Sequence, residues 1–202
     1  MISLSRHSVR LTITAVAMSL VVMLLPTPAN AITAWTRTDT YSSSSMSAPN
    51  FYFDRNWNDT RYSSMVAYIS LVGEGERRRI AVQSGSGNGN TNDCTTNQGW
   101  APAGYYGRSD GDPNAKFVFT YKTWGSPTVQ GYVWDMGNKY CTGGGTLRTE
   151  LFMHAQGRYD TSTSSSFTTA GCIKVSGNDR GYLAAKYNVA YQKTQGRLRV
   201  YG

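Results

Sequence analysis

Two residues in the segment 147–179 could carry out covalent chemistry, the imidazole of His154 and the thiol of Cys172. The chain has two histidines, and the other one, His7, lies in an N-terminal stretch that we expect to be removed. Imidazole-dependent chemistry would therefore have to use His154. A thiol becomes a good nucleophile when a neighbouring imidazole takes or stabilises its proton. We predict that His154 activates Cys172, and an active site of this kind should alkylate well below the pH at which an ordinary cysteine does.

The three cysteines divide into a pair and a remainder. An odd number in an oxidising compartment leaves one cysteine without an intramolecular partner. Cys94 and Cys141 lie in polar, loop-like sequence, NTNDCTTNQG and GNKYCTGGG, whereas Cys172 precedes the apolar residues Ile173 and Val175. The sequence predicts a Cys94–Cys141 disulfide and a free Cys172. The alternative is that Cys172 is only a buried small apolar side chain.

The group that would orient His154 is left open by the sequence. Glu150 shares a face of the predicted strand with His154, but four residues along a strand is about 13 Å, too far for direct contact. A backbone carbonyl, Asp160 and Asp179 are the candidates, in that order.

Gly171, directly before the thiol, permits the backbone angles of a tight turn. The backbone N–H groups of Ala170, Gly171 and Cys172 could then point at one spot and stabilise the oxyanion of a tetrahedral intermediate.

Residues 1–31 have the features of a secretory signal peptide. Arg6 and Arg10 precede an apolar run, 11–25, and the sequence Ala-Asn-Ala ends at Ala31. The run is short for a membrane span, which needs roughly 20 apolar residues. We expect cleavage after Ala31, no integral membrane segment in the mature protein, and a secreted, extracellular protein associated with the cell wall.

The mature chain is long enough for one domain with its own core. Loss of Arg6 and Arg10 lowers the formal net charge from +8 to +6, so anionic cell-surface polymers are plausible partners. Export and the scattered positions of Lys and Arg argue against nucleic acid. One histidine and separated cysteines form no ligand cluster, so no metal and no cofactor are expected. A monomer is expected.

The elements that must position the pair are mainly strands. Runs rich in β-branched and aromatic residues, separated by turn signals, predict strands, and turn spacing of apolar residues predicts one helix over 179–191 with Asn178 or Asp179 as its cap. The fold class is mostly β, an antiparallel sandwich or barrel-like domain with one short helix near the C-terminus. The predicted strands cover 64–72, 78–83, 116–122, 129–134, 146–154, 172–175 and 197–201.

The segment 32–61 is rich in Ser, Thr and aromatic residues but has neither helical period nor sustained alternation. We expect an N-terminal extension whose rings pack on the domain formed by 62–202, because so many aromatics do not suit a free tail. The alternative is that these rings bind the faces of sugars.

HAQG at His154, followed by TTAGCIKV around Cys172, resembles the signature of the L,D-transpeptidase catalytic-domain family: a histidine, then a Ser/Thr-x-Gly-Cys-Ile/Val-Arg turn. IAVQSGSG and GWAPAGYYG are similar to a strand, a loop and a Thr-Pro-x-Gly-x-Tyr segment of that family, with Ala101 in place of Thr. The resemblance spans 64–202.

This resemblance implies a cysteine enzyme acting on peptidoglycan stem peptides. Cys172 would attack the diamino-acid carbonyl of a donor stem, release the terminal D-alanine and form a thioester, which an amine of a neighbouring stem resolves as a 3-3 cross-link. It implies that His154 activates the thiol, that Gly171 and Cys172 supply oxyanion donors, and that Thr169 and Lys174 occupy substrate-binding positions.

Three positions depart from the family pattern. Lys174 stands where Arg is expected and cannot offer a planar fork to a carboxylate. Ala155 replaces the usual Gly, and Ala170 stands where many members have a second histidine. Lys174 and Ala155 support one alternative, a non-catalytic wall-binding module. A second alternative is an L,D-carboxypeptidase in which water replaces the acceptor amine, so that the protein trims stems, for example as a secreted toxin.

Overall fold

A computed structural model of the chain describes residues 36–42, 45–107, 112–163 and 165–202. The predicted signal peptide, 1–31, lies outside the described residues. In the described part, no helix is both long and apolar enough to cross a membrane.

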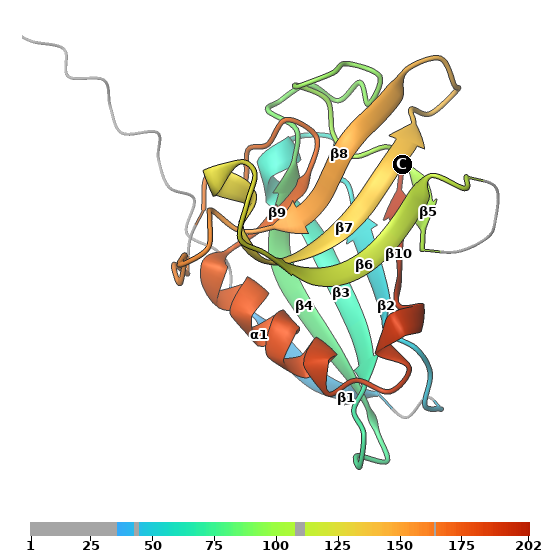
Figure 1. Cartoon of the computed structure of the whole chain (residues 1–202), viewed down its shortest axis with the longest axis vertical. Coiled ribbons are helices and arrows are strands. Elements are labelled where there is room, and N and C mark those ends of the chain that lie inside the picture. Colours follow the sequence, from blue (N-terminus) through green and yellow to red (C-terminus); the bar gives the residue numbers. More distant parts are fainter. Residues whose placement is uncertain (1–35, 43–44, 108–111, 164) are drawn as a thin grey trace, which may run out of the picture.

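The fold is mostly β, as predicted, with a single sheet curled into a nearly closed barrel (Figure 1). The strand order is β5-β10-β2-β3-β4-β9-β8-β7-β6, and β1 pairs with β4 beside this path. All pairings are antiparallel except β10 with β2 and β8 with β9. The strands are β1 (Thr38–Ser42), β2 (Asn50–Asp54), β3 (Ser63–Ser70), β4 (Arg77–Ser86), β5 (Gly104–Tyr106), β6 (Ala115–Lys122), β7 (Gly131–Tyr140), β8 (Leu147–His154), β9 (Ile173–Val175) and β10 (Arg197–Tyr201).

Each strand predicted from the sequence is present; β10 has the predicted bounds, and the ends of the other strands are shifted. The largest difference is β7, which continues to Tyr140 although the prediction stopped at Trp134. Gly137 and its polar neighbours looked like a turn, but Gly137 has a φ of 70° and takes part in a bulged pairing with β8.

The N-terminal segment supplies two strands of the same sheet. β2 is hydrogen-bonded on both sides, parallel to β10 and antiparallel to β3. Phe51 and Phe53 of β2 are fully buried, and the Phe51 ring lies 5.1 Å from that of Phe117. The prediction that rings of this segment pack on the domain is confirmed for these two residues, and the partly exposed ring of Trp57 also packs edge-on against buried Trp100, 4.8 Å away, whereas Tyr41 remains exposed.

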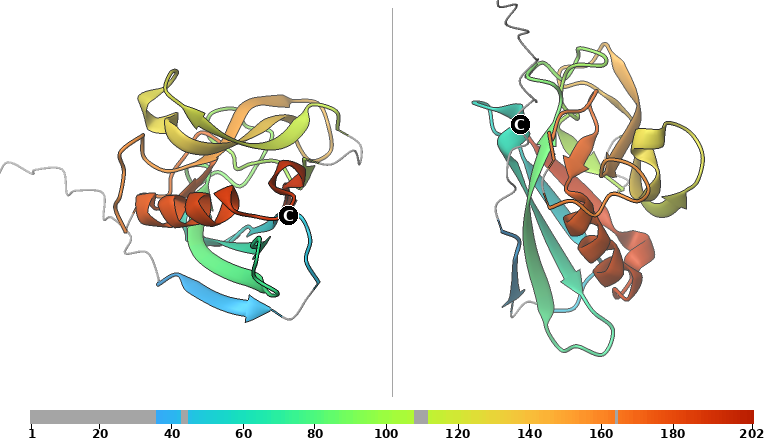
Figure 2. Two further views of the ribbon diagram at one scale, coloured as in Figure 1. Left: turned by 60° about the horizontal axis from the view of Figure 1, so that its bottom comes forward. Right: turned by 90° about the vertical axis from the view of Figure 1, so that its left-hand side faces the viewer.

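One helix, α1 (Gly177–Asn188), lies between the β3–β4 side and the β6–β7 side of the barrel (Figure 2). It buries Leu183, Ala184 and Tyr187 in the core. The cap was predicted two or three residues too late: Ser176 is the N-cap, and its hydroxyl accepts the N–H of Asp179 at 3.1 Å. Three single-turn 3₁₀ helices, η1 (Thr60–Tyr62), η2 (Pro127–Val129) and η3 (Lys193–Gln195), complete the described elements.

A bulge in β8 breaks its alternation. Arg148 pairs with Lys139 and Leu151 with Gly137, so two residues of β8 oppose one of β7. Within the bulge Glu150 has a φ of 56°, in the left-handed region. As a result Arg148 and Leu151 are both buried although they are three residues apart.

The predicted Cys94–Cys141 disulfide is present, and Cys172 is the free cysteine. The bond joins the glycine- and asparagine-rich loop after β4 to the residue that follows β7. Closing a loop of this length restricts the unfolded chain and holds the loop against the barrel.

Candidate active site

Parallel pairing of β8 and β9 brings the segments of the two predicted reactive residues side by side. Met153 pairs with Ile173 and faces the core, and His154 pairs with Lys174. Cys172 directly precedes β9 and comes two residues before Lys174. Both reactive residues therefore adjoin β8: His154 is its last residue, and the Cys172 sulfur lies against its Glu150 carbonyl.

The Cys172 thiol is half-buried beside the bulge of β8. Its sulfur lies 3.6 Å from the carbonyl oxygen of Glu150. Burial raises the pKa of the thiol to about 11, while a hydrogen bond from the Phe152 backbone and the charge of Arg148 act in the opposite direction. The resting thiol is therefore protonated at neutral pH.

The His154 ring is buried, with Nδ1 2.7 Å from the carbonyl oxygen of Ala155. Of the three candidate acceptors, the backbone carbonyl is the one found. Burial lowers the pKa of His154 to about 4; hydrogen bonding to the backbone of Ala155 and Thr128 raises it, and the charges of Lys174 and Arg180 lower it further. The imidazole is therefore neutral at neutral pH.

Both members of the pair are uncharged at rest, and among the described residues no hydrogen bond joins them. The sequence led us to expect a thiol with a lowered pKa, but in the structure burial shifts the pKa of Cys172 upward. Proton transfer from Cys172 to His154 would have to accompany attack on a substrate rather than precede it.

The turn before Cys172 is tied internally by Thr169. Its hydroxyl donates to the carbonyl oxygen of Cys172 at 2.6 Å and accepts the N–H groups of Gly87 at 2.9 Å and Gly171 at 3.2 Å. In the described structure the Gly171 N–H therefore already has an acceptor, whereas the N–H groups of Ala170 and Cys172 make no hydrogen bond there.

Gly171 has a φ of 126°, and a Cβ placed on it would lie 2.1 Å from Nη2 of Arg148. Both the backbone angle and the lack of space require glycine at this position.

Arg148 holds this turn from inside the protein. Its buried guanidinium donates through Nη1 to the carbonyl oxygens of Asp93 at 2.5 Å and Trp100 at 3.4 Å, and through Nη2 to that of Ala170 at 2.9 Å. One cation thus fixes the loop that carries Cys94 to the turn that carries Cys172.

The disulfide-bearing loop is itself anchored by the Asp93 carboxylate. This group accepts from Nη2 of Arg55 at 3.0 Å and from the Thr142 hydroxyl at 2.5 Å. Burial opposes ionisation of Asp93, but these hydrogen bonds and the Arg55 charge outweigh it and lower its pKa. These bonds hold the loop in place, and the backbone carbonyls of Asp93 and Trp100 in that loop accept hydrogen bonds from Arg148.

On the other side of His154, Arg180 of α1 orders the loop that follows β8. Its two terminal nitrogens donate to the carbonyl oxygens of Gly157 at 2.5 Å, Arg158 at 3.0 Å and Asp160 at 3.1 Å. The helix thereby holds in place the loop that follows His154, which begins with Ala155.

The two predicted substrate-binding residues bond within the protein. Besides the three bonds of Thr169, the buried Lys174 ammonium donates to Oε1 of Gln156 at 2.5 Å and to the Ser166 hydroxyl at 3.2 Å. Burial lowers the pKa of Lys174. In this arrangement Lys174 joins β9 to the Ser- and Thr-rich segment that precedes the turn.

The described residues contain one cluster with metal-ligand atoms close together, Asp93, Cys94 and Cys141. Its two sulfurs form the disulfide and are therefore not thiolates.

Comparison with known proteins gives no further assignment: the chain matches no family model, and no curated protein matches it.

Gly171→Ala should lower the free energy of unfolding by about 2 kcal/mol or more, because it combines a left-handed backbone with displacement of Arg148. The measurement is urea unfolding followed by tryptophan fluorescence. Gly181→Ala is the control: nothing lies within 4 Å of its added Cβ, and alanine in the helix should raise stability by about 0.5–1 kcal/mol. Equal effects of the two substitutions would contradict the assigned constraint.

The neutral, buried His154 should make stability depend on pH. Its folded pKa of about 4 lies below the ordinary 6.5, so the unfolded chain binds the proton first and stability is lost as pH falls from about 6.5 to 4. The loss between pH 7 and pH 4 is of order 3 kcal/mol. Urea unfolding of wild type and His154→Gln across this range measures it. A wild-type slope that matches the His154→Gln slope would refute the burial of a neutral imidazole.

Proposed function

We propose that the protein is an exported cysteine acyltransferase of the L,D-transpeptidase type, acting on peptidoglycan stem peptides in the cell wall. The observation that carries the proposal is the contact of the Cys172 sulfur with the Glu150 carbonyl of β8, the strand that ends at His154, together with the hydrogen bond between Nδ1 of His154 and the Ala155 carbonyl. A thiol and an oriented imidazole are the minimum for nucleophilic acyl transfer.

In the first half-reaction the sulfur of Cys172 attacks the carbonyl carbon of the diamino acid in a donor stem. Its proton passes to His154, whose Nδ1–H donates to Ala155 and leaves Nε2 as the basic nitrogen. The tetrahedral intermediate collapses to a thioester, and the imidazolium gives its proton to the departing amine of D-alanine. A pKa of about 4 makes this imidazolium a strong acid toward that amine.

In the second half-reaction the amine of a neighbouring stem attacks the thioester carbonyl. His154 accepts one amine proton and returns a proton to the sulfur, which leaves a 3-3 cross-link and a regenerated thiol. The N–H groups of Ala170 and Cys172 are the available oxyanion donors, because the Gly171 N–H is bonded to Thr169. Glycine is needed at position 171 because the turn requires a positive φ and leaves no space for a Cβ.

If water instead of the acceptor amine attacks the thioester, the product is a stem peptide shortened by its terminal D-alanine. The protein would then be an L,D-carboxypeptidase. The residues and the first half-reaction are the same, so the acceptor alone separates the two activities.

A non-catalytic wall-binding protein is the second candidate. It is favoured by the contact of the sulfur with the Glu150 carbonyl at 3.6 Å and by the raised pKa of the thiol, both of which stabilise an unreactive thiol.

Incubation of the purified mature protein with tetrapeptide-stem muropeptides, followed by mass spectrometry, distinguishes these functions. We expect cross-linked dimers and free D-alanine. Shortened monomers would indicate hydrolysis, and unchanged muropeptides would contradict both enzymatic functions.

Two variants assign the chemistry. Cys172→Ser keeps the size of the nucleophile, and His154→Gln keeps a polar side chain of similar size to the imidazole. Each substitution should reduce product formation by roughly 10³-fold or more. Lys193→Gln, a charge change on an exposed residue of η3, is the matched control and should retain wild-type activity.

A further inference from the structure

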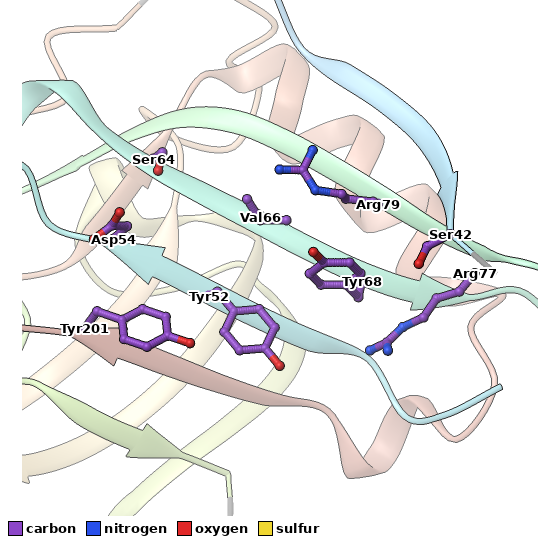
Figure 3. Close-up of a pocket in the computed structure, with 9 residues that line it drawn as sticks. All are labelled: Ser42, Tyr52, Asp54, Ser64, Val66, Tyr68, Arg77, Arg79 and Tyr201. Atoms are coloured by element: carbon purple, nitrogen blue, oxygen red, sulfur yellow. The ribbon is translucent and has the colours of Figure 1, made fainter. Parts of the chain in front are cut away.

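A groove lies on the outer face of β10, β2, β3 and β4 (Figure 3). Its volume is about 910 Å³. Alternation in the strands explains its composition, because the residues between the buried ones all point outward. We call it the tyrosine groove; it is lined by Ser42, Tyr52, Asp54, Ser64, Val66, Tyr68, Arg77, Arg79 and Tyr201.

Three tyrosine rings form its floor. Tyr52 and Tyr201 are nearly parallel, with an interplanar angle of 15° and centroids 6.1 Å apart, and Tyr68 meets Tyr52 edge-on at 5.7 Å. The face of an aromatic ring is negative and attracts the polarised C–H groups on the face of a pyranose. Their hydroxyls can hydrogen-bond sugar hydroxyls. A platform of this kind suits a saccharide.

Arg77 gives one end of the groove an unsatisfied cation. Its guanidinium lies 4.9 Å from the centroid of the Tyr68 ring, and its buried Nε and Nη2 have no acceptor among the described residues. Burial lowers the pKa of Arg77, because the charge has lost water, and the positive charge of Arg197 lowers it further. Arg79, two residues along the same strand, adds a second guanidinium to the wall. A carboxylate could satisfy these donors with the forked geometry that arginine favours.

The opposite end of the groove carries a negatively charged residue, Asp54. Asp54 and Ser64 lie beside Tyr201, away from Arg77 (Figure 3). Asp54 can accept hydrogen bonds from sugar hydroxyls but repels a second anion. A single-stranded nucleic acid, with a phosphate on each nucleotide, would bring negative charge to both ends. A glycan with an acid only on alternate sugars can place a carboxylate at the arginine end and a neutral sugar beside Asp54.

We propose that the tyrosine groove binds an acidic glycan in which neutral and carboxylated sugars alternate. A carboxylate contacts Arg77 and Arg79, and neighbouring sugar faces lie on the three tyrosines. Binding there would hold the protein on a polymer without covering Cys172, which does not line the groove. The inference does not depend on Cys172 being catalytic.

Isothermal titration calorimetry with three probes tests the ligand class. The first probe is a peptide-free tetrasaccharide of alternating N-acetylglucosamine and N-acetylmuramic acid, the second is neutral chitotetraose, and the third is a twelve-nucleotide oligothymidylate. We expect the acidic tetrasaccharide to bind at least about tenfold more tightly than either other probe, as the loss of a charge-assisted contact implies. Absence of binding, equal binding of chitotetraose, or tighter binding of the oligonucleotide would overturn the proposal.

Variants locate the site. Arg77→Gln should weaken tetrasaccharide binding by about tenfold or more, and its melting temperature should be no lower than that of wild type, because the lost cation had unpaired buried nitrogens. Lys193→Gln makes the same charge change outside the groove and should bind as wild type, as should Cys172→Ala. If Arg77→Gln does not fold, Arg79→Gln on the same strand gives the same test. Undiminished binding by a folded groove variant refutes the site.

Discussion

The buried guanidinium of Arg148 connects the parts of the molecule that shape the candidate active site. It bonds three backbone carbonyls, those of Asp93, Trp100 and Ala170, which belong to segments far apart in the chain. Without this cation the three carbonyls would be buried without donors, a state that folded proteins avoid. The position of Cys172 therefore depends on a network that extends from the disulfide loop through Arg148 to the turn.

The parallel pairing of β8 and β9 adds the second constraint. It brings the turn that carries Cys172 beside β8, which ends at His154, and both residues lie in surroundings that disfavour charge. A low-dielectric site strengthens every hydrogen bond and dipole that acts on a charge formed during reaction. The same site makes the resting thiol a poor nucleophile. Activity would thus be confined to the complex with a substrate whose carbonyl accepts the sulfur as the proton leaves.

Local signals in the sequence identified seven of the ten described strands, the helix, the Cys94–Cys141 disulfide and the mostly β class, because period-two patterns and turn residues act over short range. They missed β1, β2 and β5, which are short. They did not reveal the bulge at Glu150. With regular alternation Arg148 would point outward, so its burial had no sequence signal, and the role of Arg180 likewise depends on loops brought together only by the fold. The direction of the thiol pKa was missed for the same reason, since desolvation is set by neighbours distant in the chain.

The titration of the Cys172 thiol tests this account most directly. The protein is treated with iodoacetamide without reductant, so that the disulfide stays intact and only Cys172 reacts. The alkylation rate should rise with pH toward a midpoint of about 11. His154→Gln should leave that midpoint nearly unchanged, because the imidazole is neutral throughout. A midpoint below the ordinary value of 9.0 that moves upward in His154→Gln would show a thiolate–imidazolium pair at rest and contradict the account.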